Sequence, residues 1–336
     1  MTGDQSSMQF FRQVFGGSWI TQGIWVAAEL GIADLLAQGP LTAQELAERT
    51  RSNSDALYRV LRALASAGVF GQDELGRFAL MPIGNILRSD VPGSQRAFSI
   101  MMGAEFHTTW GELLHTVQTG EQGFRKGFSM TFFEYMTKYP ERHSIYDAAM
   151  QGIHGIETVP MLDAYDFGEF RTVADIGGGN GSALAAILER HPGMQGILFD
   201  LPAVAERARR FITDAGLSGR CLIEGGDFFS SVPAGADAYV MRHIIHDWED
   251  SDAITILRNC REAVNAGGRI LVVEMVIPPG NEPGFGKWLD LMMMLVGGRE
   301  RTEEEYRLLF SAAGLTLHRV VPTASDVSIL ECVEAS

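Results

Sequence analysis

Cysteine, basic residues and long apolar runs are all scarce in this chain. Its 336 residues include only three cysteines, Cys221, Cys260 and Cys332, which lie far apart. An odd and scattered set gives no disulfide framework, and we interpret all three as buried free thiols. Lys and Arg number 27 against 42 Asp and Glu, a formal net charge of −15. Because phosphate binding needs a basic face, this balance argues against a nucleic-acid partner.

A membrane partner is not expected either. The most apolar segment, 20–36, is interrupted by Gln22, Glu29 and Asp34 and is shorter than the roughly 20 apolar residues of a membrane helix. The first fifteen residues have no long apolar core, so no secretory signal is predicted there. With 46% hydrophobic and 21% charged residues, the composition is that of a globular protein. We therefore expect a cytoplasmic protein.

The N-terminal part reads as short helices followed by a hairpin. Capping boxes, in which Ser or Thr precedes an acidic residue by three positions, are formed by Thr42 with Glu45 and by Ser52 with Asp55. Residues 69–80 then read as two short strands joined by a turn. This order predicts a winged helix-turn-helix. Such a fold commonly binds DNA, so a regulator is one hypothesis, but near charge balance and a strongly apolar second helix favour dimerisation.

The C-terminal part alternates strands with helices. Short β-branched and apolar runs predict strands at 172–176, 196–200, 221–224, 238–241 and 270–273. Helical patterns lie between several of them, at 182–190, 203–215 and 253–264. Alternation of this kind predicts a Rossmann-like α/β fold, a parallel sheet with helices on both faces. Such sheets bind ligands at the carboxyl ends of their strands.

Three parts are therefore predicted along the chain. Residues 1–95 form a mostly helical winged-helix dimerisation domain, and residues 96–165 a helical linker that walls the substrate pocket. The linker is rich in Phe, Met, Trp and His. Residues 166–336 form the cofactor-binding catalytic domain.

A glycine loop follows the first predicted strand of the catalytic domain. Gly177, Gly179 and Gly181 let the backbone turn tightly and approach a ligand closely. The nicotinamide dinucleotide fingerprint requires glycine where this chain has Ser182. Asp175, two residues before the first glycine, is more typical of S-adenosylmethionine sites. A plain strand-to-helix turn remains the alternative for the loop taken alone.

Acidic and aromatic residues end the next two strands. Asp200 can accept both ribose hydroxyls of an adenosine. Asp227 and Phe228 offer an acceptor for the adenine amino group and an aromatic face for stacking. Singly, each is an ordinary turn or core residue, but at the ends of successive strands they describe an adenosine pocket.

Two histidines follow the fourth strand, at 243 and 246. A histidine there can act as a general base, because its pKa of roughly 6.5 suits proton removal near neutral pH. A phenol, with a pKa of about 10, is a poor nucleophile until its proton leaves. We interpret His246 as this base and His243 as structural.

These segments appear together in a known family. The five motifs lie at 175–181, 199–202, 226–229, 246–248 and 297–302. In this order they resemble those of the plant caffeate and flavonoid O-methyltransferases and of their bacterial relatives that tailor antibiotics and pigments. The resemblance covers almost the whole chain. It implies an S-adenosylmethionine-dependent O-methyltransferase of class I and, for the winged-helix part, an intertwined homodimer.

The resemblance also implies roles for individual residues. His246 corresponds to the family's base, and Glu274 and Glu300 to the acidic residues that orient it. The cofactor-binding positions are Asp175, Gly177, Gly179, Asp200, Leu201, Asp227, Phe228 and Arg242. The plant enzymes usually carry lysine where this chain has Arg242, so that contact differs in detail. The substrate-pocket positions are Phe106, His107, Trp110, Met150, His154, Asp290, Met293 and Met294.

The expected reaction moves the methyl group of S-adenosylmethionine to a hydroxyl of a small aromatic substrate and releases S-adenosylhomocysteine. No metal is expected. A phenolic polyketide, phenazine, indole or naphthoate would fit such a pocket. Alternatives that keep the cofactor are N-methylation, decarboxylation and hydroxylation, and retention of His246, Glu274 and Glu300 weighs against them.

Overall fold

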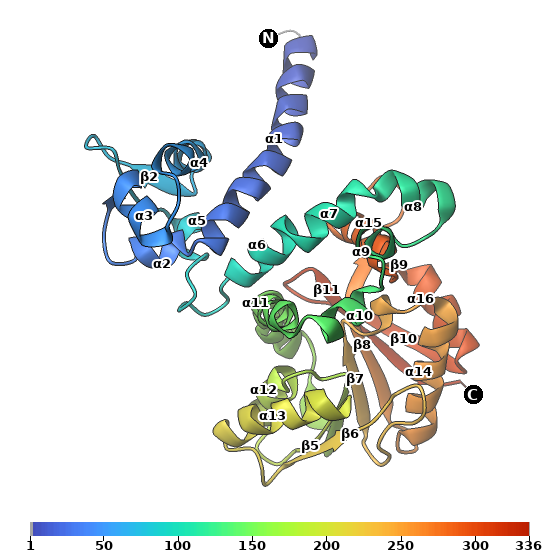
Figure 1. Ribbon diagram of the computed structural model, residues 1–336. Coiled ribbons are helices and arrows are strands. Elements are labelled where there is room, and N and C mark those ends of the chain that lie inside the picture. The colour runs from blue at the N-terminus through green and yellow to red at the C-terminus, as the bar shows by residue number, and fades with distance from the viewer. Residues whose placement is uncertain (1–2, 336) are drawn as a thin grey trace. The chain divides into compact units, whose positions relative to one another are not determined.

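The computed structural model describes residues 3–335 of the chain, which divide into two compact units (Figure 1). The first unit spans Met1–Gly155 and the second Ile156–Ser336. The division into three parts at residues 95 and 165 stays a prediction.

The first unit begins with helices and a small sheet. Its leading elements are α1 (Gly3–Glu29), α2 (Ile32–Leu36), β1 (Leu41–Thr42), α3 (Ala43–Thr50), α4 (Ser54–Ser66), β2 (Phe70–Gln72) and β3 (Arg77–Leu80). The strands pair antiparallel in the order β1-β3-β2. Leu46, Leu61 and Phe78 are fully buried in their shared core. The expected helices and hairpin are therefore present.

Of the two predicted capping boxes, one is confirmed and the other is wrong. Glu45 N donates to Thr42 Oγ1 over 3.2 Å, and Thr42 N donates to Glu45 Oε2 over 2.7 Å. The next helix is capped by Asn53, whose side chain accepts from Ala56 N over 2.9 Å. Asn is at least as good an N-cap as Ser, so the helix begins one residue later than the Ser52 box requires.

Helices make up the rest of the first unit. They are α5 (Pro82–Asn85), α6 (Arg96–Gly103), α7 (Glu105–Gly111), α8 (Leu113–Thr119), α9 (Gly123–Phe128), α10 (Phe132–Lys138) and the first part of α11 (Pro140–Ala164). The rings of Phe106 and Phe124 pack against Phe132, with centroids 6.0 and 5.4 Å away. Tyr135 packs against Phe124, with centroids 5.5 Å apart. Phe106 therefore belongs to an aromatic core.

The second unit is built on an eight-stranded sheet. Its strands are β4 (Thr172–Ile176), β5 (Gln195–Asp200), β6 (Cys221–Gly225), β7 (Ala238–Arg242), β8 (Arg269–Ile277), β9 (Arg301–Thr302), β10 (Leu315–Pro322) and β11 (Val327–Glu334). The order is β10-β11-β8-β7-β4-β5-β6, with β9 paired to β8. The five predicted strands, β4 to β8, are all present and parallel. The antiparallel pair β10 and β11 was not predicted.

Helices cover both faces of this sheet, as expected (Figure 1). α12 (Ser182–Arg190) and α13 (Pro202–Asp214) pack on one face, and α14 (Asp250–Ala263) and α16 (Glu303–Ala312) on the other. The other helical segments of the unit are η1 (Phe167–Glu169), η2 (Ile245–Asp247) and α15 (Gly286–Val296). Val173 packs with α12 and α13, whereas its neighbour Ala174 packs with α14 and α16. Successive residues of a strand point to opposite faces, so each face has its own apolar layer.

The topology brings the carboxyl ends of β4, β5, β7 and β8 to one edge. β4 lies between β5 and β7, and the strand order reverses there: β5 and β6 continue the sheet on one side of β4, and β7 and β8 on the other. This switch point is where open α/β sheets bind ligands. Across residues 3–335, no helix has the length and apolar character needed to cross a membrane.

Candidate active site

The glycine loop at the end of β4 admits no side chain at its first position. Gly177 has φ 70°, and a Cβ atom there would lie 2.4 Å from Ile244 Cδ1. The loop is closed by a hydrogen bond from Gly177 N to Phe199 O over 2.8 Å. Only glycine meets both the backbone conformation and the space. The loop is therefore more constrained than a plain strand-to-helix turn.

Asp200, at the end of β5, faces the same loop. Its Oδ2 accepts from Gly179 N over 2.8 Å, and its Oδ1 accepts from Leu201 N over 2.7 Å. These amides fix the carboxylate at the strand end. The neighbouring Leu201 is 57% exposed, so an apolar surface borders this carboxylate. Paired carboxylate oxygens beside an apolar side chain fit a ribose with an attached flat base.

A buried carboxylate lies beneath the loop. Asp175 is 2% exposed, and its Oδ2 accepts no hydrogen bond from the residues that the structure describes. Burial raises the pKa of Asp175 to about 6, an effect that the cationic Arg242 partly offsets. Arg242, at the end of β7, donates from a guanidinium nitrogen to Thr158 Oγ1 over 2.9 Å. Asp175 Oδ2, beneath the loop, can therefore still accept a hydrogen bond.

Asp227 and Phe228 follow β6 along the same edge. Asp227 Oδ1 accepts from Phe229 N over 2.9 Å, which orders the turn. The Phe228 ring lies edge-on to Trp248, with centroids 5.9 Å apart. Asn259 on α14 donates to Phe228 O over 2.7 Å. The turn therefore presents a half-buried aromatic ring held from two sides.

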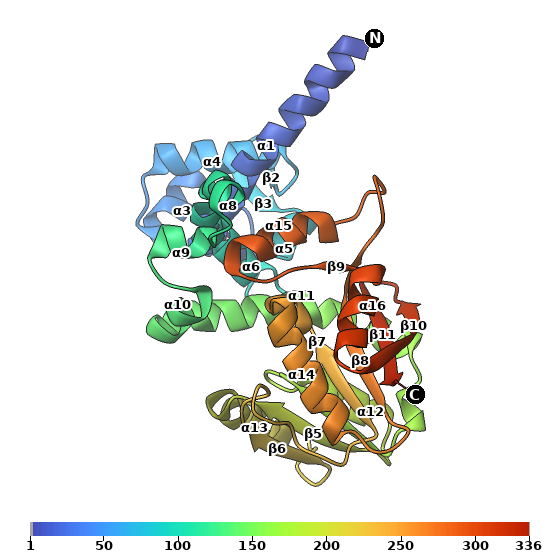
Figure 2. The same cartoon turned by 90° about the vertical axis from the view of Figure 1, so that its right-hand side faces the viewer.

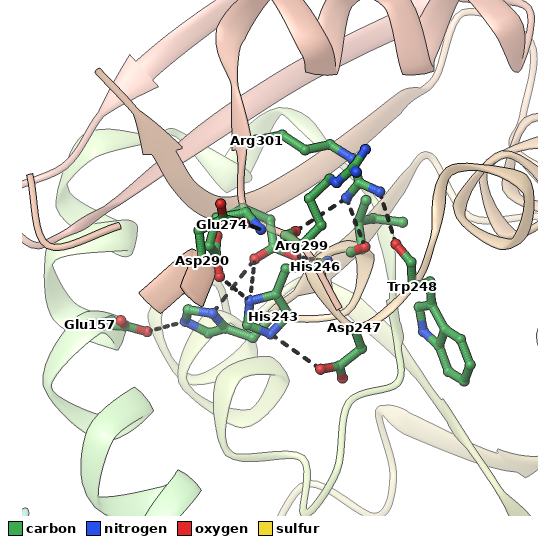
Figure 3. A network of polar contacts seen from close by, with 11 residues as sticks. Glu157, His243, His246, Asp247, Trp248, Glu274, Asp290, Arg299 and Arg301 are labelled. Atoms are coloured by element: carbon green, nitrogen blue, oxygen red, sulfur yellow. Dashed lines mark hydrogen bonds and ion pairs between the residues drawn. The ribbon is translucent and has the colours of Figure 1, made fainter. Parts of the chain in front are cut away.

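His246 lies on the short turn η2 after β7, among carboxylates (Figure 3). Its Nδ1 is 2.6 Å from Glu300 Oε1 and 3.5 Å from Glu274 Oε2. Its Nε2 is 3.6 Å from Asp247 Oδ1. The imidazole is 11% exposed, and both glutamates are fully buried. The structure thus brings together the three residues predicted for catalysis.

The charges around His246 set its proton affinity. Burial alone would lower the pKa of His246, but the carboxylates of Glu274, Asp247 and Glu300 outweigh burial and raise it. With a carboxylate oxygen 2.6 Å away, Nδ1 carries a proton and donates it in a hydrogen bond to Glu300 Oε1. Nε2 is then the nitrogen that can accept a proton from a bound molecule.

The glycine-rich segment 297–302 holds the turn that carries His246. Arg299 N donates to His246 O over 2.7 Å, and a Cβ atom on Gly298 would lie 2.2 Å from the same oxygen. Arg301 is 1% exposed, and its guanidinium donates to Ile245 O and Trp248 O over 3.1 and 2.8 Å. From the sequence, a role in this segment was predicted only for Glu300. Arg301 was missed, because nothing in the sequence distinguishes this buried arginine from the exposed Arg299 two residues earlier.

A second histidine pair lies beside the first. His243 Nε2 is 2.8 Å from Glu157 Oε2, on the part of α11 that belongs to the second unit. His243 Nδ1 lies 3.6 Å from Glu274 Oε2 (Figure 3). Glu157 was not singled out from the sequence, because nothing in the helical pattern of α11 marks it.

Three of the predicted substrate residues lie on α15 in the second unit. Asp290 Oδ1 accepts from Glu300 N over 2.9 Å, so it supports the residue that binds the base. Met293 is buried and Met294 half-buried. The other five lie in the first unit. There His107 lines a cavity of about 490 Å³ with Trp25 and Arg142, while Trp110, Met150 and His154 are half-buried. A substrate contact by any of the eight stays a prediction.

Comparison with known proteins identifies the family. A model of the O-methyltransferase domain matches residues 110–316, and a model of the O-methyltransferase dimerisation domain matches residues 12–90. The chain belongs to this O-methyltransferase family. The resemblance that the motifs indicated is thereby confirmed.

Individual relatives match over nearly their whole length. The chain is 48% identical over 320 residues to phenazine O-methyltransferase PhzM of Lysobacter antibioticus, covering 95% of this chain and 94% of that protein. It is 38% identical over 327 residues to the mitomycin biosynthesis 6-O-methyltransferase of Streptomyces lavendulae, with 95% and 93% covered. The fold matches that of NcsB1 from neocarzinostatin biosynthesis, solved with S-adenosylmethionine and 2-hydroxy-5-methyl naphthoic acid. That match has a TM-score of 0.83 at 34% identity and covers 94% of this chain and 95% of the other.

The protein is therefore an S-adenosylmethionine-dependent O-methyltransferase. The residues at this edge of the sheet fit the cofactor. Gly177 leaves room for close approach, and Asp200 offers two carboxylate oxygens as hydrogen-bond acceptors at a strand end. The buried Asp175 places a negative charge near the site, which suits a cationic sulfonium.

Proposed function

We propose that the protein methylates a hydroxyl group of a small aromatic secondary metabolite, with His246 as the general base. The observation that carries this proposal is the imidazole of His246, whose Nδ1 is bound by Glu300 at 2.6 Å. The imidazole lies at the edge of the sheet where β4 leads into the glycine loop and β5 ends at Asp200. Relatives named for phenazine, mitomycin and a naphthoate substrate support an aromatic acceptor.

The chain's own residues divide the binding work. S-Adenosylmethionine, when bound, supplies a methyl group already activated by its sulfonium. Asp200 would hold the ribose and Asp227 with Phe228 the adenine, while Gly177 and Gly179 would admit the methionine part. We propose Leu201, Asp175 and Arg242 as further cofactor-binding residues. Holding both reactants in one orientation supplies much of the acceleration.

His246 would take the hydroxyl proton at Nε2. Its Nδ1–H donates to Glu300, which fixes the ring orientation and leaves Nε2 available. The imidazolium that forms lies 3.6 Å from Asp247 Oδ1 and 2.6 Å from Glu300 Oε1. Their negative charge stabilises the protonated ring, so the acceptor oxygen attacks as the stronger nucleophile.

We also propose a cytoplasmic homodimer. Seven large apolar side chains on the first two thirds of α1 are exposed: Met8, Phe10, Phe11, Val14, Phe15, Trp19 and Ile20. This many exposed large apolar side chains on one helix support an interface with a second copy. A reducing compartment is supported by three free cysteines, all of them buried.

Formation of S-adenosylhomocysteine with a panel of aromatic hydroxyl compounds tests the reaction. Each compound is paired with its amino analogue, and the methylated atom is identified by mass spectrometry and NMR. We expect turnover on hydroxyl members and methyl ethers as products. Turnover confined to amino compounds, or consumption of substrate by decarboxylation or hydroxylation without methyl transfer, would contradict the proposal.

A further inference from the structure

Behind His246 lies a second buried pair, His243 and Glu157, that the methyl-transfer mechanism does not use. Both side chains are about nine-tenths or more buried, with 5% and 4% exposed. His243 has φ 54°, a conformation that non-glycine residues seldom adopt. Its backbone N–H donates to Val273 O over 3.1 Å. The backbone therefore holds this imidazole in one place, between Glu157 and Glu274.

The protons of the two imidazoles can be counted. Burial lowers the pKa of His243 well below its ordinary value, so the ring is neutral and carries one proton. A carboxylate oxygen 2.8 Å from Nε2 draws that proton to Nε2. Nδ1 then presents a lone pair toward Glu274 Oε2, 3.6 Å away.

On its other side Glu274 faces His246 Nδ1, whose N–H already donates a hydrogen bond to Glu300. His246 Nδ1 carries one proton, and Glu300 Oε1 at 2.6 Å takes it, whereas Glu274 Oε2 is 3.5 Å away. Glu274 Oε2 accepts no hydrogen bond from any residue between 3 and 335, and the side chain is fully buried. A buried, ionised oxygen between two nitrogens that offer it no hydrogen is unfavourable. A proton on Oε2 turns its contact with His243 Nδ1 into a donor–acceptor pair.

We propose that Glu157 and His243 are positioning residues that keep Glu274 protonated, so that Glu300 is the ionised carboxylate bound to the base. The proposal rests on the assignment of His246 as that base. With Glu274 neutral, fewer negative charges stabilise the imidazolium. His246 then releases its proton between turnovers more readily than if both glutamates were ionised.

The remaining titratable groups around the pair are consistent with this arrangement. Glu274 also faces Asp247 and Tyr306; Asp247 adds negative charge that favours a neutral Glu274, and Tyr306 stays neutral because burial raises its pKa well above 10. His243 faces Arg242, whose positive charge opposes protonation of the imidazole. His154 lies one turn before Glu157 on α11. Burial raises the pKa of Glu274, in the direction that the arrangement requires.

Nitrogen-15 NMR of histidine-labelled protein tests the tautomer without any substrate. With S-adenosylhomocysteine bound and the His243 signals assigned by their loss in His243→Asn, we expect a neutral Nε2–H tautomer from pH 5.5 to 9. In Glu157→Leu the tautomer changes to Nδ1–H, and the pKa of His246 rises by more than about one pH unit because Glu274 ionises. Glu189→Leu, which removes an exposed glutamate, leaves both unchanged. A charged or Nδ1–H His243 in the wild type, or no response in Glu157→Leu, would overturn the proposal.

A second pair of variants decides the point even where Glu157→Leu does not fold. Glutamine is a neutral isostere of a protonated glutamate. Glu274→Gln should therefore change the His246 pKa by less than about half a pH unit, and Glu300→Gln should lower it by more than about one. Equal decreases in the two variants would mean that both glutamates are ionised and would overturn the proposal. Absence of methyl transfer to any hydroxyl compound would instead overturn the proposed function, since the NMR readout does not depend on turnover.

Discussion

Three carboxyl groups lie within 3.6 Å of the His246 imidazole, and the negative charge that they carry together sets how strongly the ring holds a proton. A phenol with a pKa of about 10 gives its proton to an ordinary histidine of pKa roughly 6.5 at a cost of about 5 kcal/mol. The raised pKa of His246 reduces that cost. The same rise means that a smaller fraction of the enzyme is neutral, and hence competent as a base, at pH 7.

This trade-off predicts a pH dependence. The rate constant kcat/KM should rise with pH through the pKa of His246, so its ascending limb lies above pH 6.5. Glu300→Gln removes a negative charge that stabilises the imidazolium, so the pKa falls and the limb moves to lower pH. The maximal rate should fall as well, by about tenfold or more, because the ring is less well oriented. A pH–rate profile of both proteins measures this, and an unmoved limb would contradict the assigned role of Glu300.

At the residue scale, the sequence predicts side chains that end strands and fails for pairs made by packing. His246, Glu274 and Asp200 each follow a recognisable strand, so their common edge could be inferred. Glu157 lies in the middle of a long helix, and its contact with His243 depends on how that helix packs against the sheet. Neither periodicity nor spacing contains that information.

At the scale of elements, the glycine loop makes a sharp prediction. In Gly177→Ala the new methyl group meets Ile244 at 2.4 Å, and φ 70° disfavours any side chain. We expect the Kd for S-adenosylhomocysteine to rise by tenfold or more, which is about 1.4 kcal/mol. Gly193→Ala is the matched control, because a Cβ atom there has open space. Isothermal titration calorimetry measures both variants, and equal affinities would show that the loop tolerates a side chain.

The elements that the sequence predicted and missed differ in their environment. β4 to β8 are short apolar runs before turn residues, a strong signal for buried parallel strands. β10 and β11 form an antiparallel pair at the edge, where Leu315 and Leu317 alternate with exposed residues. That alternation, followed by turn residues at 323–326, was the available signal. Ser52 and Asn53 are both good caps, and only tertiary packing chooses between them.

At the scale of the whole molecule, α1 is the element through which we propose that the homodimer forms. The first half of this helix extends beyond the other helices of the first unit (Figure 2). Phe11, Phe15 and Trp19, spaced four residues apart, are 55%, 55% and 74% exposed. Spacing of four residues places them on one face. A single chain leaves this face in water.

A double substitution on that face tests the homodimer. Phe15→Glu with Trp19→Glu should convert a dimer into a monomer, because four buried charges per dimer would be introduced without partners. Leu75→Glu, at an exposed position of the β2–β3 hairpin, is the control and should leave the dimer intact. Sedimentation velocity gives the mass of each. A wild-type monomer, or a double variant that is still dimeric, would contradict an interface through α1.

Phenols of graded acidity test whether His246 removes the hydroxyl proton. Wild-type protein and His246→Ala are compared by kcat/KM at pH 7.5 on one aromatic scaffold whose substituents vary the phenol pKa from about 7 to 10. If His246 is the base, kcat/KM of the variant should be lower by a hundredfold or more at the least acidic phenol. The loss should shrink toward the most acidic phenol, which is already ionised and needs no base. An equal loss across the series, or none at any phenol, would contradict this role of His246.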